Sequence, residues 1–267
     1  MKLAAVLPHP PLLVPSVGRG SEDGIPDTVR AYRSICRAIA EEKPDRVVIV
    51  SSHVPMYKDL FLLPSDTEFI GNFRAFGDYD TRLDAQGDPD FLRRLMRKEA
   101  QRRIPYATDT HPQADHATAV PLFFLQEAGL HCPIVRVAIS GLSLEKHWEM
   151  GRVLAQTAKE EGGQTAFIAS GDLSHVLKET GPYGYKKEGT AYDAQVMQDL
   201  RAADFSALLD YDESFLRNAS ECGHRTFVIL GGALEKEQKK TLQSSYEGPF
   251  GVGYGTVLYE REEKTGE

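Results

Sequence analysis

Short apolar runs alternate with longer amphipathic stretches along most of the chain. Continuous runs rich in Val, Ile and Ala predict strands buried on both faces at 2–7, 46–51, 133–139 and 165–170. Stretches that repeat apolar residues every three or four positions predict helices at 28–42, 89–103, 117–128, 144–161, 188–202 and 204–210. Strands that alternate with helices predict an α/β fold with a mostly parallel central sheet and helices on both faces.

The pattern is weaker outside these elements. The segments 60–63 and 68–73 resemble short strands or loops that cover a substrate, and 104–107 is strand-like. The alternating run 251–260 predicts a late sheet strand, after which 261–267 should fray. The first fifty residues form a predicted βαβ unit with a parallel pair of strands. Because we find no repeat and no linker, we expect one domain over residues 1–267.

Composition narrows the class of protein. A chain of 267 residues with 41% hydrophobic residues can bury a full core. Its net charge of −8 argues against a nucleic-acid surface, which needs clustered Lys and Arg. Three scattered cysteines favour a reducing compartment, and no run approaches the roughly 20 apolar residues of a membrane span. We therefore expect a cytoplasmic protein that does not enter membranes.

Two histidines follow strand-like runs directly. His9 comes after 3–8, and His53 comes after 46–52. If the two runs are neighbouring parallel strands, both imidazoles reach the edge where open α/β sheets bind ligands. A divalent metal held by two imidazoles usually recruits an anionic third ligand, and Glu221 is the best candidate. Zinc hydrolases use the same ligand types, so the triad alone leaves the chemistry open.

Glu221 precedes an apolar run, 227–234, that predicts a helix. Ser220 or Asn218 can serve as its N-cap, which would place the carboxylate in the first turn, where the helix dipole favours it. A carboxylate that merely begins a helix is the structural alternative. His224 lies three residues further on and is an alternative ligand, which we assign to a supporting or structural role.

Two more histidines have settings that suit catalysis. The predicted strand 165–170 leads to His175 in a Ser-Gly-Asp-Leu-Ser-His segment, and His116 follows Asp115 at the start of an apolar helix. Two metal ligands with two further imidazoles suit a reaction with proton transfers at a metal. Both histidines have structural alternatives, in which neighbouring side chains simply hold the rings. The remaining histidines, His111, His131 and His147, are expected at the surface.

Five short motifs occur in the same order as in a known family. They are Pro8-His9-Pro10-Pro11, Ser51-Ser52-His53, Asp115-His116 with Val120-Pro121-Leu122, Ser170-Gly171-Asp172-Leu173-Ser174-His175, and Glu221-Cys222-Gly223. The chain thereby resembles the class III extradiol ring-cleavage dioxygenases of the LigB superfamily over nearly its whole length. The resemblance implies Fe(II) held by His9, His53 and Glu221, His175 as acid/base catalyst and His116 near the substrate.

The expected function is therefore that of an Fe(II)-dependent oxidoreductase that opens a catechol or aminophenol ring with O2. The expected partners are a small aromatic substrate and O2, and the resemblance implies a homodimer. The segment departs from the family pattern at Ala117, where glycine is usual. The chain also resembles the AmmeMemoRadiSam group, whose Memo branch centres its site on a cysteine. Cys222 keeps that alternative open, as a metal-binding or redox partner protein without ring cleavage.

Overall fold

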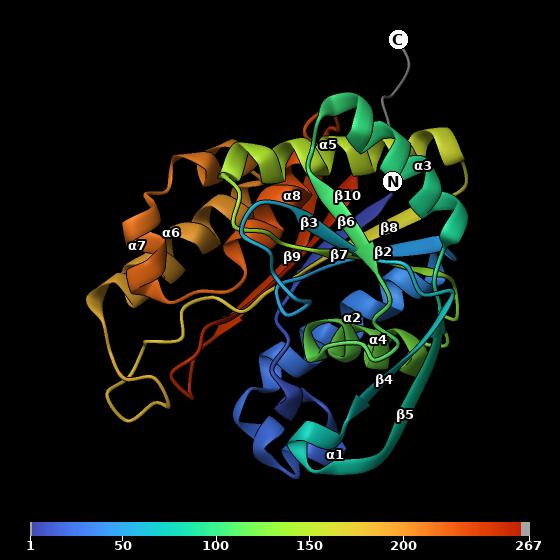
Figure 1. Ribbon diagram of the computed structural model, residues 1–267. Coiled ribbons are helices and arrows are strands. Elements are labelled where there is room, and N and C mark those ends of the chain that lie inside the picture. Colours follow the sequence, from blue (N-terminus) through green and yellow to red (C-terminus); the bar gives the residue numbers. More distant parts are fainter. Residues whose placement is uncertain (1, 263–267) are drawn as a thin grey trace.

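A six-stranded, mostly parallel sheet forms the centre of the molecule (Figure 1). The computed structural model describes residues 2–262, apart from the side chains of residues 99–101. The sheet has the order β7-β2-β8-β1-β10-β9, in which the first four strands are parallel and β10 pairs antiparallel with both β1 and β9. Its strands are β1 (Leu3–Leu7), β2 (Arg46–Ser51), β7 (Ile134–Ala138), β8 (Thr165–Ser170), β9 (Lys239–Glu247) and β10 (Tyr254–Arg261).

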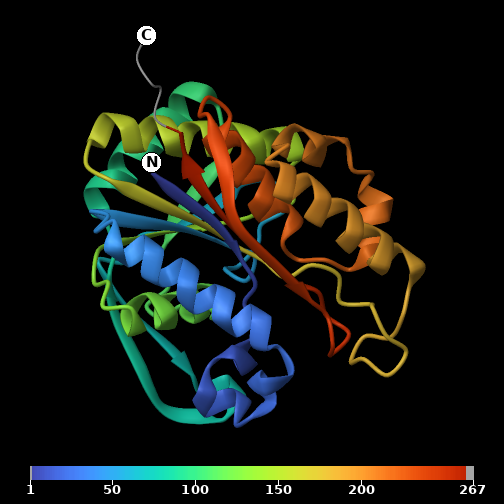
Figure 2. The same ribbon diagram turned by 180° about the vertical axis from the view of Figure 1, so that it is seen from behind.

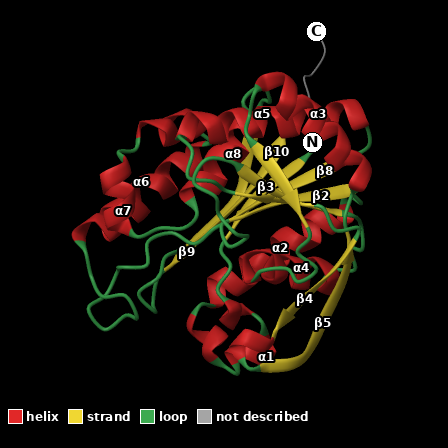
Figure 3. Ribbon diagram, viewed as in Figure 1, coloured by secondary structure: helices red, strands yellow, loops and turns green. Residues whose placement is uncertain are grey.

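Helices cover both faces of this sheet (Figure 3). The α-helices are α1 (Pro15–Gly18), α2 (Pro26–Glu41), α3 (Pro89–Arg102), α4 (His116–Glu127), α5 (Leu144–Glu161), α6 (Lys187–Ala202), α7 (Glu213–Ala219) and α8 (His224–Leu234). Two small sheets pair β3 (Phe61–Pro64) with β6 (Tyr106–Asp109) and β4 (Glu68–Phe73) with β5 (Asp78–Gln86). The predicted fold class is confirmed, and no helix among residues 2–262 combines the length and apolarity that a membrane span needs.

Alternate residues of the central strands belong to two different hydrophobic cores. Val48 and Val50 pack in the core that contains α5 and α8, whereas Val47 and Ile49 pack in the core that contains α2 and α4. Figure 2 shows α2 lying across the strands on one face, with α5 above. Because both faces of the central strands are buried, these strands are continuous apolar runs in the sequence. This is why they could be predicted.

Several predictions of local structure need correction. β1 and β2 are parallel but are not neighbours, since both pair with β8, which lies between them. The predicted helix at 204–210 is a 3-10 helix over Phe205–Asp210. The strands β5 and β9 and the helix α7 were not predicted, because polar side chains interrupt their patterns. Arg261 belongs to β10 rather than to a frayed tail, and residues 263–267 lie outside the described part.

The position of β8 places the candidate site. His9, His53 and the segment that leads to His175 all follow the carboxyl ends of parallel strands, at one edge of the sheet. The backbone N–H of Gly171 donates to the carbonyl of Leu7 at 2.9 Å, so the chain beyond β8 stays beside the chain beyond β1. This contact brings side chains from distant parts of the sequence to the same edge.

Candidate metal centre

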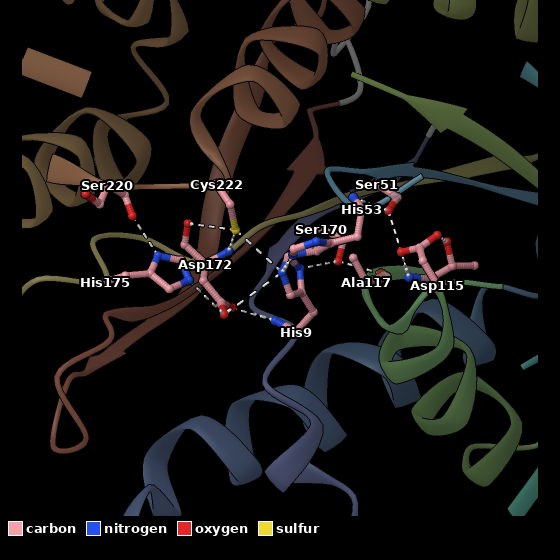
Figure 4. A network of polar contacts seen from close by, with 11 residues as sticks. His9, Ser51, His53, Asp115, Ala117, Ser170, Asp172, His175, Ser220 and Cys222 are labelled. Atoms are coloured by element: carbon pink, nitrogen blue, oxygen red, sulfur yellow. Dashed lines mark hydrogen bonds and ion pairs between the residues drawn. The ribbon is translucent and has the colours of Figure 1, made fainter. Parts of the chain in front are cut away.

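Side chains from five segments converge at the carboxyl edge of the sheet (Figure 4). The Nε2 atoms of His9 and His53 lie 3.1 Å apart, and the Sγ atom of Cys222 lies 3.5 Å from the Nε2 atom of His9. One donor atom from each of these three residues falls within 4.8 Å of the others. Imidazole nitrogen and thiolate sulfur are common ligands of first-row transition metals, so the three residues fit a metal ion.

The tautomer of His9 is fixed by its neighbours. The hydroxyl of Ser170 donates to the carbonyl of Ala117 at 2.6 Å, so toward the Nδ1 atom of His9, 3.1 Å away, it can only accept. The proton of the neutral ring therefore sits on Nδ1, and the lone pair of Nε2 points into the cluster. Histidines that bind metals are usually held in this way through their second nitrogen.

His175 is held by the loop after α7. Its Nδ1–H donates to the carbonyl of Ser220 at 2.8 Å, and its backbone N–H donates to the same carbonyl at 3.3 Å. In the neutral ring, Nε2 therefore carries the lone pair, and it lies 4.0 Å from Oδ2 of Asp172. A free imidazole nitrogen beside the donor cluster can accept a proton or bind a ligand.

His116 begins α4 and lies against the other histidine rings. Its ring centroid is 4.1 Å from that of His53 and 5.2 Å from that of His9. Asp115 is the N-cap of α4 and also accepts a hydrogen bond from the hydroxyl of Ser51 at 2.6 Å. Asp115 thus ties the end of β2 to α4 and brings His116 beside His53.

Glu221 makes a hydrogen bond at the start of α8, and its role as a metal ligand stays a prediction. Its Oε2 atom accepts the backbone N–H of His224 at 2.6 Å, so the carboxylate caps α8. The groups of donor atoms found among the described residues contain Cys222 instead. The expected N-cap, Ser220, has a left-handed conformation with φ of 53° and ends α7, while Gly223 is the N-cap of α8. The loop geometry thus turns the thiol, rather than the carboxylate, toward His9.

His224 is buried in a structural network. Its Nε2 atom donates to the carbonyl of Leu208 at 2.9 Å, and its Nδ1 atom accepts the hydroxyl of Tyr192 at 3.2 Å. His147 is fully buried, contrary to the surface position expected for it. It accepts the backbone N–H of Ser140 and donates to the carbonyl of Ser143, so it orders the start of α5. The sequence offered no sign of this burial beyond its place on an apolar helix stripe.

Two glycines allow the loops of the site to meet. A Cβ atom on Gly171 would lie 2.2 Å from the Cα atom of Gly223, a distance that real atoms do not reach. The contact brings Asp172, next to Gly171, against Cys222, next to Gly223. The backbone N–H of Asp172 accordingly donates to the Sγ atom of Cys222 at 3.3 Å.

Asp172 lies between the imidazoles of His9 and His175, and the sequence suggested it only as a side chain that could hold His175. Its Oδ1 atom accepts the backbone N–H of His9 at 2.7 Å, and its Oδ2 atom lies 4.0 Å from the Nε2 atoms of both His9 and His175. Its place in the Gly-Asp-Leu-Ser-His segment, three residues before His175, was the available signal. Asp172, His175 and Cys222 form a second group of donor atoms within 4.8 Å.

Burial sets the charge state of the cluster. Burial, with the neighbouring His53, His116 and His175, lowers the pKa of His9 well below its usual value. Burial also lowers the pKa of His116 to about 4 and raises that of Asp172 to about 7. The imidazoles are therefore neutral at pH 7, which is the form that binds a metal. A bound dication would favour the ionised forms of Asp172 and Cys222.

The hydrogen bond from His9 to Ser170 gives a first prediction. Ser170→Ala removes the acceptor that fixes the His9 tautomer, and partners of this kind contribute about 10- to 100-fold to metal affinity. We expect a loss of that size in a titration against a competing chelator. Ser34→Ala, at an exposed position on α2, is the matched control and should leave affinity unchanged. Equal affinity in both variants would contradict this assignment.

Fold and donor cluster together define an α/β protein with a candidate metal centre at the carboxyl edge of its sheet. The chain belongs to the family described as the catalytic LigB subunit of aromatic ring-opening dioxygenase, which matches residues 3–257. The resemblance expected from the five motifs is thereby confirmed.

Similar proteins support the membership of this chain in the family, but their names describe no activity. A Clostridium acetobutylicum protein is 33% identical over 264 residues, which cover 96% of this chain and 56% of that protein. A MEMO1 family protein of Methanosarcina mazei is 26% identical over 156 residues, 55% of each chain. This chain spans about half the length of the curated relatives it matches.

A solved structure supports the fold. The crystal structure of an uncharacterized protein from Escherichia coli K12 superposes with a TM-score of 0.65 over 97% of this chain and 99% of that one. Because the two sequences are only 18% identical, the likeness shows the fold alone.

Proposed function

We propose that this chain is an iron-dependent oxidoreductase that opens the ring of a small aromatic substrate with O2. The substrate would carry two adjacent hydroxyls, or a hydroxyl beside an amine. The observation that carries the proposal is the cluster of neutral histidines around one thiol, with the lone pair of His9 Nε2 directed into it. Membership of the ring-opening dioxygenase family supports the class of reaction.

His9, His53 and Cys222 would hold the metal, and Glu221 is the alternative third ligand that the sequence suggested. Bound Fe(II) would supply open positions for substrate and O2, together with one-electron chemistry. His53 is solvent-exposed while His9 is buried, so the cluster is open to solvent on the His53 side. A small substrate can therefore approach without a large rearrangement of the chain.

The remaining histidines would handle protons. The Nε2 atom of His175 is available because Nδ1–H is held by Ser220, so it can accept a proton from a substrate hydroxyl and later return it. His116 lies beside His53 and can donate to, or accept from, the second polar group of the substrate. The direct test is anaerobic loading with one equivalent of Fe(II), then O2 uptake over a panel of catechols and aminophenols. Absence of uptake with every substrate, in protein that holds iron, would overturn the proposal.

The position of Cys222 favours a second candidate function. A metal-binding or redox protein of the MEMO1 type would use the same cluster without ring cleavage, and MEMO1 family proteins are among the relatives of this chain. Iron that cycles between oxidation states without substrate turnover would support this function over the first.

The third ligand can be identified by a pair of variants. Cys222→Ala should lower metal affinity by more than about 100-fold, because even the partners that orient a ligand contribute 10- to 100-fold. Glu221→Ala should retain metal and change stability only modestly, since it removes one hydrogen bond to the backbone N–H of His224. Chelator competition and denaturant unfolding measure the two effects. The opposite ranking of metal affinities would make Glu221 the ligand.

A further inference from the structure

Cys222 lies at the meeting point of two groups of metal-binding atoms. The first group is His9, His53 and Cys222, and the second is Asp172, His175 and Cys222. In each group the donor atoms lie within 4.8 Å of one another. Figure 4 shows His175 and His53 on opposite sides of Cys222 and Asp172. The thiol therefore has one set of donors on either side.

The donors of the second group are oriented as ligands would be. The Nδ1–H of His175 is held by the carbonyl of Ser220, which leaves Nε2 to face Oδ2 of Asp172 at 4.0 Å. The other oxygen of Asp172 is held by the backbone N–H of His9 at 2.7 Å, so the carboxylate cannot rotate freely. An imidazole with one nitrogen fixed and a carboxylate with one oxygen fixed form a preorganised pair.

We propose that the protein binds a second divalent metal ion, held by Asp172, His175 and Cys222, with the Cys222 thiolate shared between the two metals. Two-metal sites in proteins hold their ions about 3.5–4 Å apart, a spacing that a single bridging atom can span. The imidazole and thiolate donors suit a borderline ion such as Zn²⁺. The carboxylate and the thiolate together offset two of the four positive charges of two dications.

The second ion would also regulate the site, an inference that rests on the proposed function. His175 cannot accept a proton at Nε2 while that atom binds a metal. Protein that holds one iron should therefore turn over, and added Zn²⁺ should lower turnover by the same 10²- to 10⁴-fold as loss of a proton-transfer group.

Metal counting tests the site without any activity. The apoprotein is titrated anaerobically with Zn²⁺ against a chromophoric chelator, and native mass spectrometry counts the bound ions. We expect two ions in the parent protein and one in His175→Ala. His131→Ala, which changes an exposed histidine, is the matched control and should bind two. The second site would be overturned by one bound ion in the parent protein or by two bound ions in His175→Ala. One bound ion in His131→Ala would also overturn it.

Cobalt gives an independent readout of the shared thiolate. Thiolate-to-Co²⁺ charge transfer should rise with both the first and the second equivalent, because both ions bind the same sulfur. A rise that ends at the first equivalent would overturn the shared ligand. Turnover that survives two bound ions would overturn the regulatory role, whereas absence of turnover in the one-iron protein would count against the proposed function alone.

Discussion

The His53→Ala variant is expected to lose tight metal binding and keep the fold of the parent protein. His53 supplies one of the two imidazole nitrogens of the cluster, 3.1 Å from that of His9. Removal of a direct ligand should lower metal affinity by more than about 100-fold, beyond the effect of a supporting residue. The side chain is exposed, so its loss leaves no cavity in either core. Iron content after anaerobic loading and the thermal midpoint measure both parts.

A matched histidine variant tests whether the loss of metal is specific to the histidines of the cluster. His131→Ala removes an exposed imidazole outside the cluster and should retain the metal content of the parent. His9→Ala should lose metal like His53→Ala, with some loss of stability because the ring is buried. If His53→Ala holds as much iron as the parent protein, His53 is not a ligand of the metal centre.

Turnover in the His175→Ala variant, loaded with one equivalent of iron, is expected to fall by 10²- to 10⁴-fold. This is the usual contribution of a positioned proton-transfer group. The first donor group does not contain His175, so iron content should stay at the level of the parent. Burial lowers the pKa of His175, so the ring is neutral and able to accept a proton at pH 7.

The pH profile adds a second readout for His175. Because the pKa of His175 lies below its usual value of 6.5, activity should be retained at neutral pH. Activity should be lost as the pH falls through this lowered pKa and the ring becomes protonated. In His175→Ala, this acidic limb should disappear from whatever turnover remains. Loss of iron in the one-equivalent protein would instead make His175 a ligand of the first metal. Normal turnover would leave it with a structural role.

The order of the elements could be predicted because the buried positions of strands and helices are apolar and recur at a spacing typical of each. The strands β2 and β8 and the helix α5 were bounded to the residue, since their apolar runs and stripes end at polar or turn residues. β9 was missed because it alternates between exposed and half-buried positions at the edge of the sheet. An edge strand needs no apolar run, so its sequence resembles that of a loop.

The spatial order of the strands was not available from the pattern. β1 and β2 follow each other among the predicted strands, yet β8, more than a hundred residues later, lies between them. Strand pairing depends on how the helices pack on the two faces, and no local periodicity records that choice. Nonetheless, His9 and His53 meet, because both strands end at the same edge of the sheet.

By itself, the sequence determined the α/β class and the candidate residues His9, His53, His116 and His175. Each follows an apolar run or begins a helix, and such positions at the carboxyl edge of a parallel sheet face a ligand site. Only the tertiary structure decided which side chain joins the histidines.

Glu221 and Cys222 are adjacent in the chain, and no pattern distinguishes their directions. The left-handed turn at Ser220 and the close contact of Gly171 with Gly223 direct the thiol to His9 and leave the carboxylate to cap α8. The same contact places Asp172 between His9 and His175. These directions depend on two loops that meet only in the folded chain, which is why the sequence could name the segment but not the direction of each side chain.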